Sequence, residues 1–309
     1  MVEETLKLEV SDDHKIFVYN WRPDGDNRVK GIVQIAHGMA ETAYRYNRFA
    51  KRLVEQGYIV YANDHRGHGK TAASLDEVGY IGPDGFNRMV EDMKELTQFI
   101  QNKENSDLPL FLFGHSMGSF LSQRYISLYG NSIQGVILSG TSGSQGPILN
   151  IGIGIAKREI AKNGPKARSP RLNDLSFGSY NKKFEPSRTE FDWLTRDEKE
   201  VDKYMEDPYC GGIFTTSFYY DFFKGLKENF KKSNLENIPK NLPIYIFAGD
   251  KDPVGNMGKG VLKLVKTYQR LGIKDLEYKL YKDGRHEMLN EINRDEVMED
   301  VINWLDKHI

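Results

Sequence analysis

One serine of this chain stands between two glycines at the end of an apolar run. In "LFLFGHSMGS", residues 110–114 have the composition of a buried strand, and Ser116 follows between Gly114 and Gly118. A sharp strand-to-helix turn holds such a serine exposed, and the residues two positions away must be small because bulk would collide with the opposite arm. A hydroxyl held in this way becomes a nucleophile when a base accepts its proton. The pattern therefore predicts that Ser116 attacks a carbonyl carbon.

A histidine late in the chain is the predicted base. Proteins with this serine turn on a parallel sheet place the three partners in the order serine, acid, histidine. Of the seven histidines, His286 fits this order because it follows the apolar run 276–281 and precedes the last helical pattern. His308 is expected to be solvated at the frayed end of that helix. Apart from Asp64, no third ligand stands at useful spacing from His65 and His68, so we predict packing roles for them and no metal site.

The acid that orients the histidine has two candidates. The stretch "IYIFAGDKDPV" places Asp250 and Asp252 directly after an apolar run at 244–249. Either carboxylate can hold an imidazole in one tautomer, and either can bond its own backbone in a turn ahead of Pro253. All candidates follow the carboxyl ends of predicted parallel strands, where ligands of open sheets bind. We therefore expect serine, acid and histidine to converge at one edge of the sheet.

The sheet that must position these residues is predicted from recurring apolar runs. Alternating stretches at 6–10 and 16–21 predict an antiparallel hairpin. Further apolar runs with helical patterns between them predict parallel strands, and these runs lie at 31–37, 58–63, 110–114, 135–140, 244–249 and 276–281. Apolar residues at steps of three and four predict helices over 86–100 and 296–309. The predicted fold class is α/β, with an eight-stranded, mostly parallel sheet flanked by helices.

Residues 141–240 interrupt this rhythm. Scattered glycines and prolines and the charge cluster "TRDEKEVDK" predict a mostly helical insertion after the sixth strand, here called the cap. Residues 1–140 and 241–309 then form the core domain. The cap needs aromatic side chains for its own packing, and we expect some of them to line a pocket for an apolar substrate. The candidates are Phe177, Trp193, Phe214, Phe218 and Phe222.

Composition excludes several function classes. Lysine plus arginine total 43 against 44 acidic residues, a net charge of -1 without a basic run, so we predict no nucleic-acid binding. The single cysteine, Cys210, excludes an internal disulfide framework and a CxxC motif. "GIGIAK" lacks the third glycine of a dinucleotide loop, so we predict no cofactor. The chain shows neither a secretory signal nor an apolar run of the roughly 20 residues that cross a bilayer, and we expect a cytoplasmic protein.

The combined motifs resemble the monoacylglycerol lipase and lysophospholipase branch of the α/β-hydrolase superfamily, which is grouped with the serine aminopeptidases (S33). The matching pieces are "HGMAE" (37–41), "RY" (45–46), "NDHRGHGKT" (63–71), "GHSMGS" (114–119), "GDKDPV" (249–254) and "GRHEMLNE" (284–291). The resemblance extends over nearly the whole core and is weaker through the cap. It implies the α/β-hydrolase fold.

The resemblance also implies roles for single residues. It selects Asp252 as the acid, because the acid of the family stands three residues after the glycine of this motif. It places one oxyanion donor at the backbone N–H of Met39, and the serine turn itself requires a second at the N–H of Met117. It suggests that Glu41 and Arg45 support the Met39 loop. A solvated surface pair is the other interpretation of those two residues.

The predicted function is hydrolysis of carboxylic esters of lipid-like substrates, a monoacylglycerol or a lysophospholipid. Ser116 attacks the carbonyl, His286 accepts the proton and returns it to the leaving alcohol, and Asp252 holds the imidazole. Two interpretations of the mixed apolar and basic stretch 148–162 stay open, transient contact of the cap with a membrane surface and a cap helix packed on the core.

Other functions on the same fold stay open. An aminopeptidase and a thioesterase use the same three residues. A peptidase also needs an acidic cap residue for the substrate amine, and the candidates are Glu190, Asp192 and Glu198. A non-catalytic ligand-binding protein is a further alternative, against which the presence of all three triad residues argues.

Overall fold

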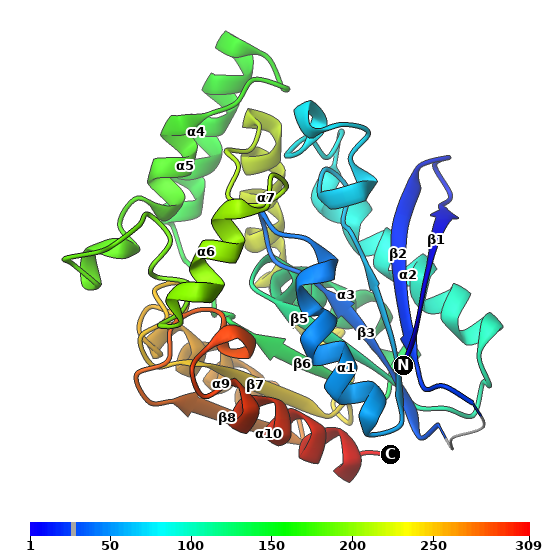
Figure 1. Ribbon diagram of the computed structural model, residues 1–309. Coiled ribbons are helices and arrows are strands. Elements are labelled where there is room, and N and C mark those ends of the chain that lie inside the picture. Colours follow the sequence, from blue (N-terminus) through cyan, green and yellow to red (C-terminus); the bar gives the residue numbers. More distant parts are fainter. Residues whose placement is uncertain (26–28) are drawn as a thin grey trace.

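The fold is organised around one sheet with the strand order β1-β2-β4-β3-β5-β6-β7-β8 (Figure 1). The computed structural model describes residues 1–25 and 29–309. Within them the strands are β1 (Val2–Glu9), β2 (Lys15–Arg22), β3 (Gly31–Ala36), β4 (Tyr58–Asn63), β5 (Leu110–His115), β6 (Gly135–Ser139), β7 (Ile244–Gly249) and β8 (Leu276–Tyr281). These are the eight strands that the apolar runs predict.

The strand directions confirm the predicted hairpin and the parallel sheet. β1 pairs with β2, and β2 with β4, in antiparallel register. Every pairing from β4 through β3, β5, β6 and β7 to β8 is parallel. Strands β3 to β7 are buried along their whole length, which explains why they are continuous apolar runs rather than alternating ones.

Helices cover both faces of the sheet. One face packs against α1 (Asn47–Glu55) and α10 (Arg294–Lys307), and the other against α2 (Gly85–Lys103), α3 (Met117–Tyr129) and α9 (Lys259–Arg270). The strands alternate between the two layers. In β5, Phe111 and Phe113 join the first layer, whereas Leu110 and Leu112 join the second. Because the strands from β4 to β8 are parallel, the segments that follow their carboxyl ends leave the sheet at the same edge.

The cap follows β6, where the sequence predicts it. Its helices are α4 (Ile148–Asn163), α5 (Pro170–Phe177), α6 (Glu198–Glu206), α7 (Thr216–Asn229) and α8 (Lys232–Glu236). Helices α4 and α5 lie farthest from the sheet, and α6 lies between them and the core (Figure 1). Short 3-10 helices complete the described chain: Ala43–Tyr46, Gly69–Thr71, Leu75–Glu77, Gly130–Ser132, Asn181–Lys183 and Met288–Asn290. None of the helices in the described ranges has both the length and the apolar character to cross a membrane.

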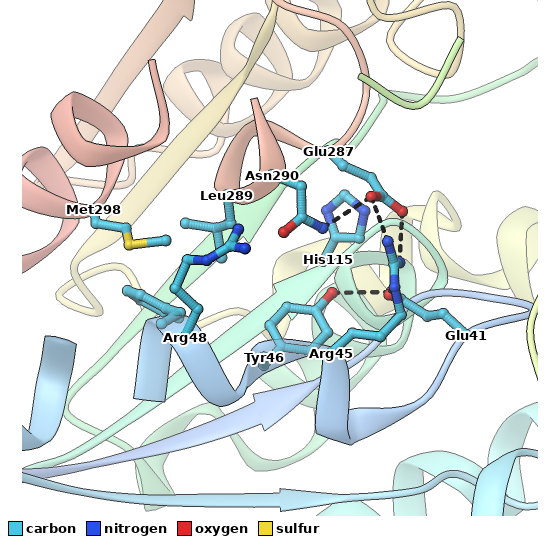
Figure 2. A pocket seen from close by; sticks show the side chains of 10 residues that line it. Glu41, Arg45, Tyr46, Arg48, His115, Glu287, Leu289, Asn290 and Met298 are labelled. Atoms are coloured by element: carbon cyan, nitrogen blue, oxygen red, sulfur yellow. Dashed lines mark hydrogen bonds and ion pairs between the residues drawn. The ribbon is translucent and has the colours of Figure 1, made fainter. Parts of the chain in front are cut away.

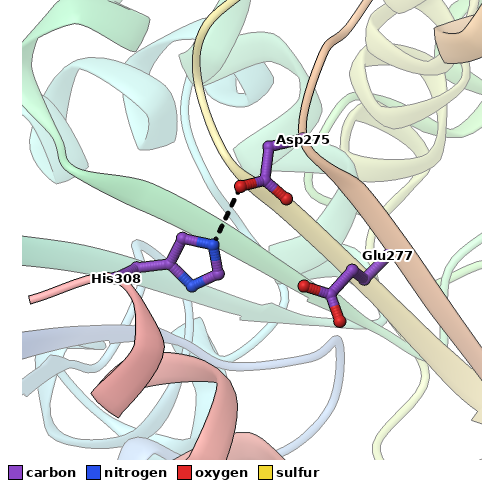
Figure 3. A group of neighbouring side chains, drawn as sticks. All are labelled: Asp275, Glu277 and His308. Atoms are coloured by element: carbon purple, nitrogen blue, oxygen red, sulfur yellow. Dashed lines mark hydrogen bonds and ion pairs between the residues drawn. The ribbon is translucent and has the colours of Figure 1, made fainter.

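His308 is not solvated, contrary to the sequence-based expectation. Its side chain is only 7% exposed, because Nδ1 lies 2.6 Å from Trp304 O and Nε2 lies 3.0 Å from Asp275 Oδ2. Glu277 lies beside them and accepts a hydrogen bond from Lys307 at 2.6 Å (Figure 3). The end of α10 is thus bonded to the residue before β8. Apolar periodicity in the sequence does not reveal this partner of His308.

Candidate active site

Ser116 lies on the predicted strand-to-helix turn, between β5 and α3. It has φ 51° and ψ −119°, a strained conformation for a residue with a side chain. Its backbone N–H donates to Ser139 O at 2.9 Å, which fixes the turn to the neighbouring strand. A Cβ on Gly118 would lie 2.0 Å from Ala36 O, and one on Gly114 would lie 2.5 Å from Gly118 O. Both glycines are therefore required by close backbone contact.

His286 and Asp252 form a buried pair. His286 Nδ1 lies 3.0 Å from Asp252 Oδ1, and the two residues are 2% and 0% exposed. The same Oδ1 accepts a hydrogen bond from the Val254 N–H at 2.8 Å. Asp250 instead accepts from the Asp283 N–H at 2.8 Å and so closes a turn. The geometry separates the two aspartates that the sequence leaves open.

The surroundings of His286 favour its protonated form. Burial in itself lowers the pKa of the imidazole, but the charge of Asp252 and the hydrogen bond to it outweigh this and raise the pKa above 6.5. A raised pKa makes the imidazole a better proton acceptor. The arrangement can therefore take a proton from a nearby hydroxyl and hold the resulting cation.

One cavity brings the serine and the histidine together. It measures about 730 Å³, and Ser116, His286, Met39 and Trp193 all line it. Ser116 is partly exposed to it, whereas His286 is almost entirely buried. The hydrogen bonds of the described residues do not include one from Ser116 Oγ to His286. Such bonds commonly tighten only when substrate is bound.

Two backbone N–H groups, one in a loop that lines the cavity and one directly after Ser116, have no hydrogen-bond acceptor in the part of the chain that the structure describes. Met39 lines the cavity in the loop after β3, and Met117 is the first residue of α3, so its N–H has no partner inside the helix. Within the described residues, neither N–H has a hydrogen-bond acceptor. They are available to an oxygen that becomes negative during a reaction.

Glu41 and Arg45 form a buried network rather than a surface pair. Arg45 donates to Glu41 Oε2 at 2.6 Å and, through two nitrogens, to both carboxylate oxygens of Glu287 at 2.7 Å (Figure 2). Glu41 Oε1 accepts from the Gly38 N–H at 2.5 Å and from Tyr46 Oη at 2.9 Å. The network therefore connects the loop that carries Met39 to the residue that follows His286.

Charge compensation keeps Glu287 ionised despite its burial. Burial raises the pKa of Glu287, but the Arg45 guanidinium and its hydrogen bonds outweigh burial and hold that pKa well below 4.5. Sequence analysis did not identify Glu287 as a partner of Arg45. The sequence feature that pointed to a role for Glu287 was its position in the motif "GRHEMLNE", directly after His286.

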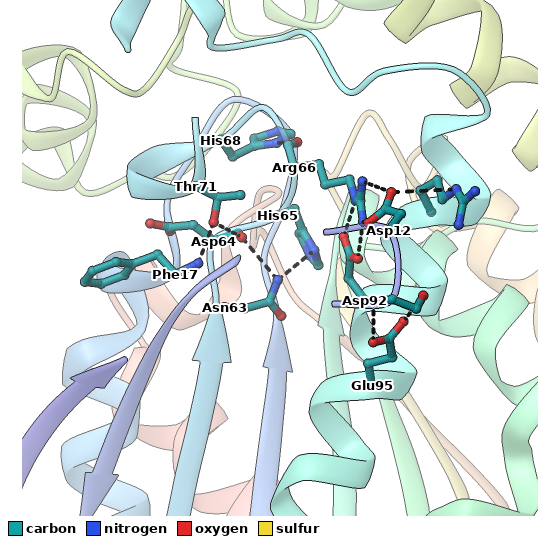
Figure 4. Close-up of polar contacts among 12 residues, drawn as sticks. Asp12, Phe17, Asn63, Asp64, His65, Arg66, His68, Thr71, Asp92 and Glu95 are labelled. Carbon is teal, nitrogen blue, oxygen red and sulfur yellow. Dashed lines mark hydrogen bonds and ion pairs between the residues drawn. The ribbon is translucent and has the colours of Figure 1, made fainter. Parts of the chain in front are cut away.

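His65 and His68, in the motif "NDHRGHGKT", pack against His37. The rings of His37 and His65 lie 4.4 Å apart, and those of His37 and His68 lie 5.1 Å apart. His37 Nε2 accepts the His65 N–H at 2.9 Å, and burial lowers the pKa of both His37 and His68 to about 3. The carbonyl oxygen of Asp64, directly before His65, accepts a hydrogen bond from Thr71 Oγ1 at 2.7 Å (Figure 4). Neutral histidines thus fill the space under the Met39 loop.

Only some of the cap aromatics line the cavity. Phe177 and Trp193 do so. Phe214 and Phe218 do not, because they are fully buried against the ring of a core histidine. Phe222 packs on phenylalanines of α2 and α3. Two of the five candidates therefore line the cavity and three pack against the core, because an aromatic residue in the sequence indicates burial but not what covers the side chain.

Polar side chains form much of the cavity wall. Of the predicted acidic residues, Glu190 lines the cavity, together with Asp174. Asp192 instead uses its carboxylate on Thr189, whose Oγ1 lies 2.6 Å away. Glu198 begins α6 and is not among the residues that line the cavity. The cavity thus has room for an apolar chain and a polar group together.

The chain is similar to proteins of known sequence and structure. The family described as "Hydrolase_4: Serine aminopeptidase, S33" matches residues 27–293. A monoacylglycerol lipase of Mycolicibacterium smegmatis is 27% identical over 289 residues, 94% of this chain and 92% of that relative. Phospholipase YtpA of Bacillus subtilis is 24% identical over 294 residues, 94% of this chain and 100% of that relative. A thermostable carboxyl esterase of Bacillus coagulans, solved in complex with glycerol, superposes with a TM-score of 0.91 at 30% identity, covering 100% of this chain and 99% of that one.

Proposed function

The chain belongs to the family described as Hydrolase_4, serine aminopeptidase S33, and we propose that it is a serine hydrolase that cleaves carboxylic esters of lipid-like substrates. The proposed substrates are monoacylglycerols or lysophospholipids. The monoacylglycerol lipase and the phospholipase among its relatives support this choice, as does the carboxyl esterase with the same fold.

One observation carries the proposal. The strained serine turn and the buried His286–Asp252 pair open on a single cavity of about 730 Å³. A strained non-glycine residue is maintained only where the surrounding structure enforces it, and such residues gather at functional sites. A structural role for Ser116 would not require this backbone conformation.

In the proposed mechanism, Ser116 Oγ attacks the ester carbonyl while His286 accepts the hydroxyl proton. The negative oxygen of the tetrahedral intermediate binds the N–H groups of Met39 and Met117. The intermediate collapses, the leaving alcohol takes the proton from His286, and the acyl group stays on Ser116. Water then attacks the acyl-enzyme with His286 again as base, and the free acid leaves. Asp252 keeps the imidazole in the required tautomer and stabilises its cation.

Substitution of the serine tests the nucleophile. Ser116→Ala is expected to lose hydrolysis of short p-nitrophenyl esters by at least about 1000-fold, with an unchanged circular dichroism spectrum. A fluorophosphonate probe should label the wild-type protein and not the variant. Ser127→Ala, in the same helix and away from the cavity, is the control and should keep full activity. Activity that survives in Ser116→Ala would reject the proposal.

A second candidate function is an aminopeptidase. It is favoured by the family description and by Glu190, a carboxylate in the cavity wall that suits a substrate amine. Hydrolysis rates of a monoacylglycerol and of an aminoacyl-naphthylamide should be compared on the same preparation. We expect the monoacylglycerol to be cleaved faster. The opposite order, together with loss of the amide activity in Glu190→Gln, would favour the peptidase.

We also propose that the cap touches lipid surfaces transiently through α4. Ile148 and Ile151 are each 65% exposed at its start, and exposed Lys157, Arg158 and Lys162 follow. Apolar side chains beside cations suit the interface of an anionic membrane. Flotation with phosphatidylglycerol vesicles should recover the wild-type protein. Ile148→Glu with Ile151→Glu should abolish recovery while p-nitrophenyl ester hydrolysis persists, and equal recovery of both proteins would contradict the proposal.

A further inference from the structure

The backbone that carries His286 is held by the cap. The His286 N–H donates to Trp193 O at 3.4 Å, and the Glu287 N–H donates to Leu194 O at 2.7 Å. The preceding amide, that of Arg285, donates to the carboxylate of Glu291 at 2.9 Å. None of these three successive N–H groups bonds to a strand of the sheet.

Glu291 connects the two segments from inside. It is 0% exposed, and its Oε1 accepts the N–H groups of Arg285 at 2.9 Å and Arg196 at 3.2 Å. Its Oε2 accepts the Arg196 Nε–H at 2.9 Å and the Ile292 N–H at 3.0 Å. Four donors occupy the four acceptor positions of one carboxylate. Two of them come from the cap and two from the loop after β8.

Further contacts extend this junction on both sides. Thr195 Oγ1 donates to Asn290 O at 3.0 Å, and Arg196 Nη2 donates to Asn293 Oδ1 at 3.2 Å. The Arg285 guanidinium donates to Asp192 O and, at 3.3 Å, to Thr195 O. Hydrogen bonds from cap residues 192–196 thus reach both ends of the loop 284–291.

We propose that Glu291 is a positioning residue, which fixes His286 by holding cap residues 192–196 against the loop 284–291. The proposal rests on the serine-hydrolase function above. His286 reaches Asp252 from this loop, and the ring of Trp193 lies 5.0 Å from the imidazole. A shift of the segment therefore moves the base relative to the serine, which stands on the sheet. Displacement by about 1 Å is enough to lower a rate about 100-fold.

Glu291→Gln is the first test. The glutamine NH₂ places a donor against N–H groups that need an acceptor, so at least one of the four donors is left unpaired. We expect kcat for a p-nitrophenyl ester to fall about 10- to 100-fold, with KM little changed. Weaker contact with Asp252 should also move the acidic limb of the pH profile to lower pH. Rates are expressed per folded protein, which thermal denaturation quantifies.

A matched control separates positioning from general damage. Asp92 is likewise a buried carboxylate, 1% exposed and paired with Arg66 at 2.6 Å, but it lies in α2. Asp92→Asn should lose stability and keep the wild-type kcat and pH profile. Arg196→Ala removes only the side-chain donors and leaves its backbone N–H on Glu291, so its loss of kcat should be smaller than that of Glu291→Gln.

A measurement that does not depend on enzyme activity separates the positioning role of Glu291 from the proposed hydrolase function. The downfield proton NMR signal of the His286 Nδ1–H should disappear or shift in Glu291→Gln and persist in Asp92→Asn. An unchanged signal and kcat in folded Glu291→Gln, or equal losses in both variants, would overturn the positioning role. A wild-type protein with this signal but without esterase activity or fluorophosphonate labelling would instead overturn the hydrolase function.

Discussion

Ser116 and His286 reach the same cavity from supports of different kinds. Ser116 stands on the core, since its N–H bonds to β6 and its neighbouring glycines touch backbone atoms of the sheet region. His286 stands on a loop whose N–H groups bond to the cap and to Glu291. The nucleophile is thus fixed by packing against the core, and the base by hydrogen bonds to the cap.

Different kinds of substitution should disturb the two supports. A backbone packed at van der Waals distance is disturbed by any added bulk, whereas a hydrogen-bonded loop is disturbed by loss of a partner. This difference separates the variants that should act on the serine side from those that should act on the histidine side. It also predicts that the two sides respond differently to pH.

Among the variants that leave the nucleophile in place, the largest effect is expected from substitution of the acid. Asp252→Asn preserves shape but no longer favours the imidazole tautomer with a proton on Nδ1, and removal of such a carboxylate lowers kcat by about 10⁴-fold. The pKa of His286 should also fall, because burial lowers it and the charge that opposes burial is gone. The acidic limb of kcat/KM is therefore expected to move to lower pH.

The neighbouring aspartate is the control. Asp250→Asn keeps an oxygen that accepts the Asp283 N–H in the turn and loses only the charge beside Lys251, 3.5 Å away, so its kcat and pH profile should match the wild type. If Asp250→Asn loses as much activity as Asp252→Asn, the assignment of the acid is wrong. Steady-state rates over a range of pH decide between these outcomes.

A change at the serine turn should have the next largest effect. In Gly118→Ala the new Cβ would lie 2.0 Å from Ala36 O, so the turn and β3 must separate. Both predicted oxyanion donors lie on these two segments, and loss of one such donor lowers rates about 100- to 1000-fold. Fluorophosphonate labelling should slow to a similar degree. Gly154→Ala, where the space around the glycine is open, should label at the wild-type rate, and equal rates for both variants would contradict a serine fixed by backbone packing.

The sequence predicts the serine side more completely than the histidine side. Ser116, Gly114 and Gly118 lie within five residues, so their spacing alone indicates the turn and its close contacts. The strand pattern also predicts which loops meet at the carboxyl edge of the sheet, because parallel strands leave no other arrangement. Local sequence and topology are sufficient there.

The histidine side depends on contacts that no local pattern contains. Arg45 and Glu287 are separated by 242 positions, and Arg196 and Glu291 by 95. In the sequence, each of these residues cannot be distinguished from a solvated charge on the surface. Only the folded chain shows that it is buried and paired. Phe214 and Phe218 could not be distinguished from Phe177 and Trp193 for the same reason, since burial against the core and burial against a substrate give one sequence pattern.

Substitution of Gly140 should disturb the position of His286 with a smaller effect on kcat. It has φ 56°, and a Cβ there would lie 2.9 Å from both His286 Cε1 and His115 Cε1. Gly140→Ala should displace the imidazole and lower kcat about 10-fold, less than a full 1 Å displacement would. Gly272→Ala also has a positive φ, 78°, but nothing lies near its Cβ. It should lose stability alone, and a similar kcat in both variants would show that the imidazole tolerates the added methyl group.

The smallest effect on activity is expected from substitution of His68, one of the neutral histidines that pack against His37. His68 Nδ1 lies 2.9 Å from Arg66 O, and burial lowers its pKa from 6.5 to about 3. Below pH 6.5 the unfolded chain binds a proton there and the folded protein does not. The free energy of unfolding therefore falls by about 1.4 kcal/mol per pH unit until the pH approaches 3. His68→Asn keeps a donor for the same carbonyl and takes up no proton, so urea denaturation should show a slope shallower by this amount, with kcat near the wild-type value at neutral pH. Parallel pH dependences of the two proteins would show that His68 takes up its proton in the folded protein as readily as in the unfolded chain.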